Sequence, residues 1–219
     1  MNNHRHSSSS PCSKLIPVSC ITSFYELSAV LSNGKMDQFS KYDGKVTLVV
    51  NMASCDKNTK KELLQLNELV SSCGSRGLVV LVFPSNQLGK LEPLENNEML
   101  PFLYHVRPGL KFEPKFLLFS KVLVNGSDSH PVYEFLRLKQ PYPTDDDCQI
   151  SRDHTMICWD PVTRHDISGN YEKFLISHDG IPVKRYTQKA SIETLKRDID
   201  IQLKRIPKQP KDHLHVFHQ

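Results

Sequence analysis

The chain has no run of about 20 consecutive apolar residues, the length that a helix needs to cross a bilayer. It also has no dense basic stripe, because 28 Lys and Arg are interleaved with 24 Asp and Glu, which leaves a net charge of +4. Nucleic-acid binders usually concentrate their positive charge on one face. We therefore expect a protein that binds neither membranes nor nucleic acid.

Paired cysteines are missing as well. The six cysteines include no CxxC pair, and no Cys/His cluster has the spacing of a zinc site. An even count does not predict a disulfide framework in a chain of this length, so mostly free thiols are expected, with no bound metal or cofactor.

The first 20 residues contain only a short apolar patch at 15–18, too short for the core of a secretory signal. A cytosolic protein is therefore expected, or a secreted one if a signal segment is missing from this chain. Residues 1–20 are rich in Ser, Asn and Pro and are interpreted as a flexible tail. Residues 21–204 are expected to form one α/β domain, and residues 205–219 a flexible basic tail.

A β-α-β unit is predicted in the first half of the domain. Residues 46–51 and 78–83 are compact β-branched runs, typical of strands buried on both faces. Between them, residues 58–70 place leucines on one helical face, and Gly74 and Gly77 are expected to end that helix. A strand, a helix and a strand in this order imply a right-handed crossover and a parallel pair.

The remaining pattern predicts a mixed sheet flanked by helices. Helices are expected at 95–105, 131–138 and 191–203, the last with an apolar stripe. Strands are expected at 23–30, 116–119 and 122–124, and a hairpin at 171–186 around the Asp179-Gly180 turn.

Four segments resemble the glutathione peroxidase family. They are Val-Asn-Met-Ala-Ser at 50–54, the run 77–89, Val-Arg-Pro-Gly at 106–109 followed by Phe-Glu-Pro at 112–114, and Asn-Tyr-Glu-Lys-Phe-Leu at 170–175. Their order and spacing follow the family over residues 21–203. The resemblance implies a thioredoxin-like fold, reduction of hydrogen peroxide or organic hydroperoxides by glutathione or another thiol, and a catalytic set of selenocysteine or cysteine, glutamine, tryptophan and asparagine.

By this resemblance, Asp56 stands where the family keeps its selenocysteine or cysteine. A chalcogen at a helix N-terminus is held ionised and attacks the O–O bond of the peroxide. It then passes through a sulfenic or selenenic acid that thiols reduce. A carboxylate suits the same electrostatic position and is expected to cap the helix, but its oxygens cannot pass through those oxidation states.

Two of the family's other three catalytic positions also differ in this chain. Leu91 stands at the glutamine position and Gly169 at the tryptophan position, whereas Asn170 retains the asparagine. Cys55, next to Asp56, is a possible surrogate nucleophile. Because successive side chains at a strand end point in opposite directions, its sulfur is expected to point away from the site.

The resemblance also implies a glutathione-facing rim, here represented by Lys61, Arg107 and Lys189. Lysine lacks the bidentate fork of arginine, so the rim is expected to be weaker. Residues 102–119 include the loop of the larger, tetrameric family members, which suggests a homo-oligomer or a partner for an active paralogue.

Three hypotheses follow. The favoured one is a family member with lost or strongly impaired peroxidase chemistry that acts by binding or oligomerisation. The second is a residual thiol peroxidase that uses Cys55. The third is a non-catalytic module that binds glutathione as a ligand instead of consuming it as a co-substrate.

Overall fold

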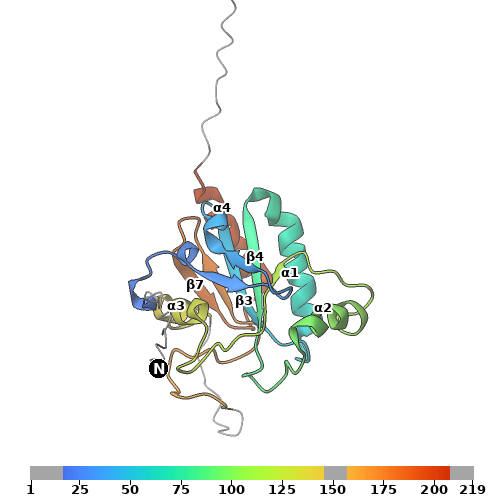
Figure 1. Cartoon of the computed structure of the whole chain (residues 1–219). Coiled ribbons are helices and arrows are strands. Elements are labelled where there is room, and N and C mark those ends of the chain that lie inside the picture. The colour runs from blue at the N-terminus through green and yellow to red at the C-terminus, as the bar shows by residue number, and fades with distance from the viewer. Residues whose placement is uncertain (1–16, 146–156, 208–219) are drawn as a thin grey trace, which may run out of the picture.

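The computed structural model describes residues 17–145 and 157–207 (Figure 1). Five strands form one mixed sheet in the order β5-β4-β3-β6-β7, and β1 and β2 form a separate antiparallel hairpin. The strands are β1 Ser28–Val30, β2 Met36–Gln38, β3 Val46–Met52, β4 Leu78–Pro84, β5 Leu117–Leu118, β6 Lys173–Ile176 and β7 Pro182–Tyr186. The helices are α1 Thr59–Cys73, α2 Asn96–His105, α3 Pro131–Lys139 and α4 Ile192–Arg205.

The predicted β-α-β unit is confirmed. Strands β3 and β4 pair in parallel from Val46 opposite Leu78 to Met52 opposite Pro84. Helix α1 connects them, followed by a 3-10 turn at Gly74–Arg76, and Gly77 then takes a left-handed conformation with φ of 106°. Only a residue without a Cβ adopts this conformation readily, which explains the glycine at the helix end.

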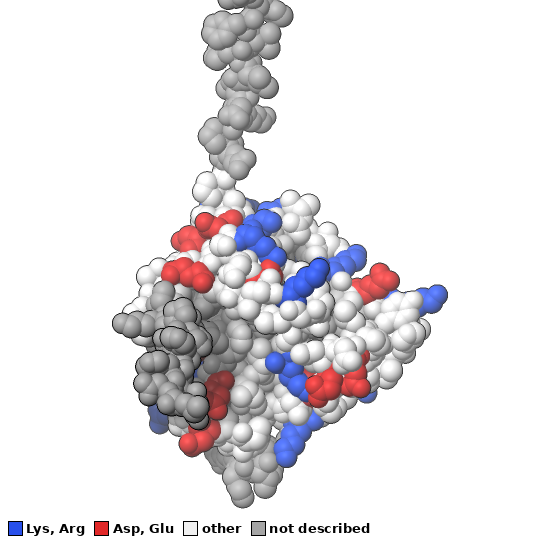
Figure 2. All heavy atoms as spheres, in the orientation of Figure 1, with Lys and Arg blue, Asp and Glu red and all other residues white. Residues whose placement is uncertain are grey.

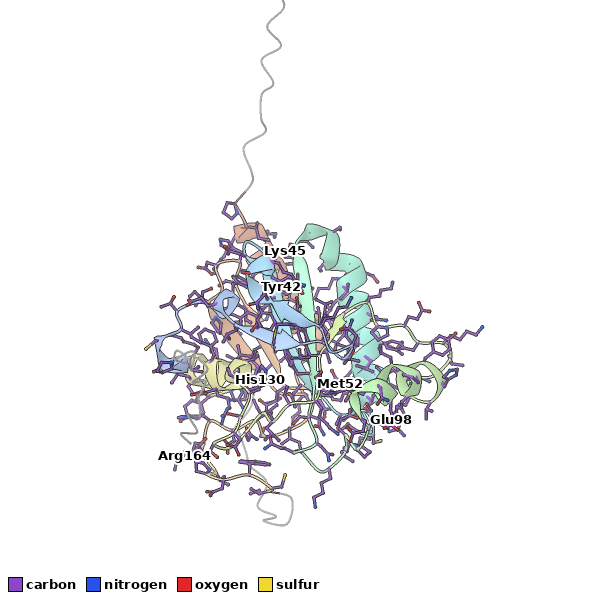
Figure 3. All side chains as sticks on the ribbon, viewed as in Figure 1. Tyr42, Lys45, Met52, Glu98, His130 and Arg164 are labelled. Atoms are coloured by element: carbon purple, nitrogen blue, oxygen red, sulfur yellow. The ribbon has the colours of Figure 1, made fainter. Side chains whose placement is uncertain are left out.

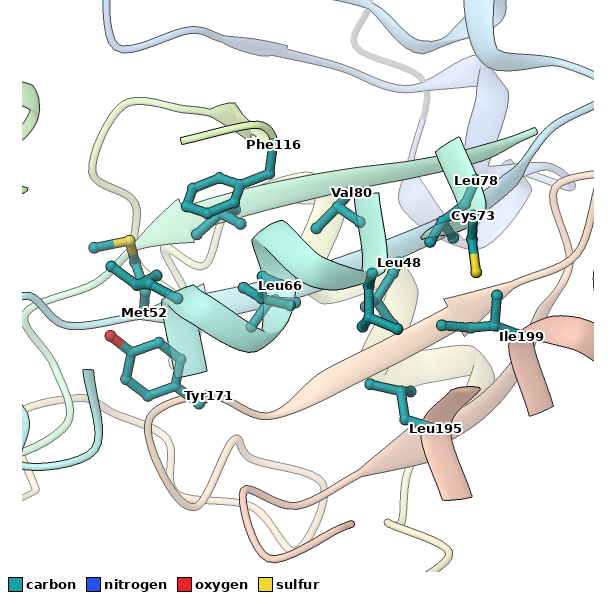
Figure 4. Close-up of a cluster of buried hydrophobic side chains, with 14 of the residues drawn as sticks. Leu48, Met52, Leu66, Cys73, Leu78, Val80, Phe116, Tyr171, Leu195 and Ile199 are labelled. Atoms are coloured by element: carbon teal, nitrogen blue, oxygen red, sulfur yellow. The ribbon is translucent and has the colours of Figure 1, made fainter. Parts of the chain in front are cut away.

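Alternating side chains of the central strands build two hydrophobic clusters, one on each face of the sheet. Leu48 and Val50 of β3 face a cluster with α1, α2 and α4, whereas Val49 faces one with α3 and the β1-β2 region. Figure 1 shows α3 on the opposite side of the sheet from α1 and α2, and Figure 4 shows side chains of α1 and α4 gathered over Leu48. All residues of β3 are buried, as expected of a central strand covered on both faces.

The strand expected at 23–30 is only partly correct. Residues Phe24–Glu26 form a 3-10 turn, and only Ser28–Val30 are extended. The reason is a capping box: the Ser23 hydroxyl accepts from the N–H of Tyr25, and the Glu26 carboxylate accepts from the N–H of Ser23 at 2.7 Å.

The strand expected at 122–124 is wrong. The N–H of Val122 donates to the carbonyl of Pro84. Beyond Val122, however, the backbone bonds to the amide side chain of Gln87. Its oxygen accepts from the N–H of Val124 at 2.7 Å and of Asn125 at 2.9 Å. These N–H groups therefore bond to a buried side chain and not to a neighbouring strand.

The predicted tails lie mostly outside the described residues. Of the first 20 residues, Val18–Cys20 form a 3-10 turn, and Val18 packs against the cluster of α3. Helix α4 continues to Arg205. Of the six cysteines, Cys12 and Cys148 lie outside the described residues, and the other four are free thiols.

A buried ion pair joins α1 to β6. The ammonium of Lys173 lies 3.0 Å from a carboxylate oxygen of Glu62, and both side chains are only 5% exposed. The same ammonium donates to the carbonyl of Tyr171 at 2.8 Å. The pair therefore fixes α1 against the segment that leads into β6.

Loss of one partner of this pair is expected to destabilise the fold strongly, because a buried charge is left uncompensated. We expect Lys173→Met to lower the free energy of unfolding in urea by about 3–5 kcal/mol. The matched control is Arg76→Met, which breaks the exposed pair with Asp200 and should cost no more than about 1 kcal/mol. Equal losses in the two variants would contradict the stabilising role of the Glu62–Lys173 pair.

Candidate functional site

Three chain segments meet beyond the carboxyl ends of β3 and β4. Strand β3 ends at Met52, which Figure 3 labels at the end of the strand opposite Lys45. Strand β4 ends at Pro84, and β6, antiparallel to β3, begins at Lys173 beside the end of β3. Loops beyond the carboxyl ends of parallel strands are the usual place for a site in α/β proteins.

A pocket of about 270 Å³ lies between these loops. Four of the sequence-predicted positions line it: Asp56, Leu91, Gly169 and Asn170. The other described lining residues are Leu88, Gly89, Trp159, Ile167, Ser168 and Gln188. The pocket wall is thus largely apolar, with one carboxylate and two side-chain amides.

The carboxylate of Asp56 bridges two parts of the site. One oxygen accepts from the N–H of Asn58 at 2.8 Å, and the other accepts from the side-chain amide of Asn170 at 3.2 Å. The expectation that Asp56 caps α1 needs correction, because the residue that precedes the helix is Asn58. Asp56 binds the N–H of that residue in a turn before the helix, where a negative charge is still favoured by the helix dipole.

Asn170 is 7% exposed and holds two loops together. Its amide nitrogen donates to Asp56 and also to the carbonyl of Leu88 at 3.2 Å. Its amide oxygen is buried and has no hydrogen-bond partner among the described residues. A buried acceptor without a partner is unusual in a folded protein.

Leu91 and Gly169, the two predicted positions without a polar side chain, have different surroundings. At Leu91, the backbone carbonyl accepts from the N–H of Cys55 at 2.9 Å, so the loops after β3 and β4 are joined directly. A Cβ added at Gly169 would meet no heavy atom within 4 Å. The glycine therefore leaves open space at the pocket.

Below these loops, Glu92 fixes the backbone that precedes Asp56. One of its carboxylate oxygens accepts from both the N–H and the hydroxyl of Ser54, each at 2.7 Å. Burial raises the pKa of Glu92 above its ordinary value, and the hydrogen bonds from Ser54 act in the opposite direction. Glu92 thus positions the loop from outside the pocket.

Cys55 is half-buried and is not among the described residues that line the pocket. Its backbone is held on both sides, because its N–H donates to Leu91 and its carbonyl accepts from the guanidinium of Arg107 at 3.1 Å. The same nitrogen of Arg107 donates to the carbonyl of Asp56 at 3.1 Å. Arg107 therefore contacts the backbone of the site and not the carboxylate of Asp56.

The other two predicted cations lie away from the pocket lining. Lys61 is exposed on the first turns of α1, and Lys189 is exposed after β7. Figure 2 shows acidic and basic side chains interspersed over the face in view. The structure thus brings Arg107 to the site and leaves Lys61 and Lys189 on the surface.

Sequence reasoning missed Trp159 and the pocket position of Gln188. Trp159 is the only tryptophan in the chain, and its indole N–H donates to Asp166 at 2.8 Å. The oxygen of Gln188 accepts from the side-chain amide of Asn58 at 2.9 Å, and its amide nitrogen is buried without a partner among the described residues. A lone tryptophan shortly before Gly169 was the available signal, but no periodic pattern connects it to the site.

Within residues 17–145 and 157–207, no group of three or more His, Cys, Asp or Glu is arranged to hold a metal ion. In the same parts of the chain, no helix combines the length and apolar content of a membrane span.

Comparison with known proteins identifies the scaffold. The family model described as glutathione peroxidase matches residues 24–137. Glutathione peroxidase 1 of Macaca fuscata fuscata is 41% identical over 197 residues, which cover 90% of this chain and 98% of that protein. The glutathione peroxidase of Molluscum contagiosum virus subtype 1 is 47% identical over 157 residues, covering 72% of this chain and 71% of the viral protein.

The chain belongs to the glutathione peroxidase family.

Solved structures agree with the fold of this glutathione peroxidase family member. The crystal structure of T. cruzi GPX1 is 26% identical, with a TM-score of 0.60 over 84% of this chain and 97% of that one. A thioredoxin family protein from Chlorobium tepidum, 15% identical, has a TM-score of 0.50 over 81% of this chain and 92% of its own, and shares the fold alone. The predicted thioredoxin-like α/β fold is therefore confirmed.

The open space at Gly169 predicts that a small side chain is tolerated there. We expect Gly169→Ala to change the free energy of unfolding by less than about 1 kcal/mol, because the new Cβ meets no neighbour. The matched control is Gly180→Ala, where φ is +83° and a Cβ would lie 1.9 Å from the hydroxyl of Ser23. Urea denaturation of both variants checks this, and a large loss at Gly169 would mean that the pocket wall is closed there.

Proposed function

We propose that this glutathione peroxidase family protein has lost peroxidase chemistry and acts by binding. The observation that supports it best is that Asp56, which the family resemblance aligns with the reactive chalcogen, lines the pocket. In the peroxidase reaction, a chalcogenolate attacks one peroxide oxygen, the O–O bond breaks, and water or an alcohol leaves. The chalcogen is thereby oxidised to a selenenic or sulfenic acid, which two thiols reduce.

A carboxylate supports none of these steps, because its oxygens are neither soft nucleophiles nor centres that cycle between oxidation states. The polar partners are also replaced, by Leu91 and Gly169. The alternative of a Cys55 peroxidase is less favoured, since Cys55 is not among the described residues that line the pocket. The names of the relatives make glutathione a candidate ligand for this protein, with Arg107 near the site as one possible contact.

A coupled assay of NADPH oxidation with hydrogen peroxide and glutathione tests the loss of chemistry. We expect background rates for the wild type and for Cys55→Ser, and little gain for Asp56→Cys alone. The triple variant Asp56→Cys/Leu91→Gln/Gly169→Trp should exceed Asp56→Cys by about 10²-fold, because positioned polar partners contribute at least this much. Wild-type turnover that disappears in Cys55→Ser would establish the alternative instead.

We also propose that the protein self-associates or pairs with an active paralogue through the segment after α2. Two apolar side chains support this: Leu110 is 92% exposed and Val106 is 63% exposed. They lie four residues apart after α2, and covering both in a contact would remove apolar surface from water.

Light scattering tests the self-association. We expect the wild type to be oligomeric and Val106→Glu to shift the protein toward the monomer, because a buried charge at an interface is costly. Ile181→Glu, at an exposed apolar residue on the β6-β7 turn, is the control and should leave the mass unchanged. A monomeric wild type would contradict homo-oligomerisation and leave only pairing with a paralogue.

A further inference from the structure

The pocket carries a negative charge without a cationic side chain in its wall. Asp56 contributes the carboxylate, and no Lys or Arg is among the described residues that line the pocket. The nearby guanidinium of Arg107 is bonded to the backbone carbonyls of Cys55 and Asp56, not to the carboxylate. A ligand that enters this pocket therefore meets a carboxylate that, within the described residues, accepts hydrogen bonds from Asn58 and Asn170.

Two further polar atoms on pocket-lining residues are buried and have no hydrogen-bond partner within the described parts of the chain. The amide oxygen of Asn170 is an acceptor on a side chain that is 7% exposed. It belongs to the same amide group as the nitrogen that donates to Asp56. On Gln188, the atom without a partner among the described residues is the amide nitrogen, a donor. Because both atoms are buried, the group that the pocket offers to a ligand is the carboxylate of Asp56.

The wall beside these groups is aromatic. Trp159 is among the described residues that line the pocket, and its indole N–H already donates to Asp166. The ring is therefore left with its π surface and edges for a ligand, and an indole face attracts cations better than any other side-chain ring. Space for the ligand comes from Gly169, where nothing lies within 4 Å of the Cβ position.

We propose that this pocket binds the α-ammonium end of an amino acid or short peptide. The ammonium donates to the carboxylate of Asp56, and its positive charge lies against Trp159. This inference rests on the proposed function in one respect, because it requires that Asp56 takes no part in peroxide reduction. Glutathione would then enter the pocket by its γ-glutamyl amino end and not by its sulfur.

The chemistry also explains what the pocket rejects. A neutral ligand would desolvate the carboxylate of Asp56 without replacing its hydration, and a thiolate would add like-charge repulsion. An N-acetylated ligand loses both the charge and most of the donors. Selectivity for a free ammonium is therefore the signature of this site.

Fluorescence reports directly on the pocket, because Trp159 is the only tryptophan in the chain. The probe is S-methylglutathione, whose sulfur is blocked and whose α-ammonium is free, and it is compared with its N-acetyl derivative. We expect a saturable change in emission with S-methylglutathione and at least about tenfold weaker binding of the acetylated compound, equivalent to 1.4 kcal/mol. Calorimetry on the same pairs provides a readout that does not depend on the fluorophore.

The deciding variant is Asp56→Asn, which keeps the shape and removes the charge. It should weaken binding of S-methylglutathione about tenfold or more and leave the acetylated compound unaffected. Asp200→Asn removes the same charge from the surface of α4 and should bind like the wild type. Thermal unfolding of both variants verifies that they are folded.

Three results would overturn the proposal. The first two are equal binding of the acetylated compound and unchanged binding of S-methylglutathione in Asp56→Asn. The third is the absence of both heat and emission change at about 10 mM probe, a concentration well above the millimolar dissociation constant of a weak site. None of them bears on peroxidase turnover, which is measured separately. Failure of the ammonium site and failure of the proposed loss of chemistry are thus distinguishable.

Discussion

The buried ion pair between Glu62 and Lys173 is the constraint on which the site depends. It joins the first turns of α1 to the start of β6, and these two segments carry Asp56 and Asn170 just before them. Tyr171 strengthens the junction, because its hydroxyl donates to the carbonyl of Ala53 at 3.1 Å. Burial raises the pKa of Tyr171 far above its ordinary value, so the hydroxyl stays a donor. The carboxylate of Asp56 and the side-chain amide of Asn170 are therefore held in a fixed relative position.

Under the proposed function, Asp56 keeps a negative charge before α1 where the family carries its reactive chalcogen. A helix N-terminus stabilises a negative charge whether sulfur, selenium or oxygen carries it. The carboxylate of Asp56 is held by the N–H of Asn58 in the turn before that helix. What a carboxylate adds is a negatively charged group in a largely apolar pocket. Such a charge attracts a ligand of opposite charge. A binding role is therefore compatible with the family fold.

Where sequence patterns failed, a polar side chain bonds to the backbone N–H groups of the segment. Residues 122–124 have the composition of a strand, but Gln87 occupies the N–H group of Val124 that a neighbouring strand would need. Residues Phe24–Glu26 form a 3-10 turn because Ser23 and Glu26 cap it. In both cases side-chain hydrogen bonds to the backbone outweighed the strand propensity of the segment, which is weak compared with its context.

The sequence by itself determined the β-α-β core, the mixed sheet and the family, because alternating and helical apolar periods and fixed motif spacing are written along the chain. It also predicted that Asp56, Leu91, Gly169 and Asn170 belong to one site, and all four line the same pocket. Only the tertiary structure decided which side chains complete the pocket wall. Trp159 and Gln188 reach it from separate loops, and their contacts depend on long-range packing that no local pattern encodes.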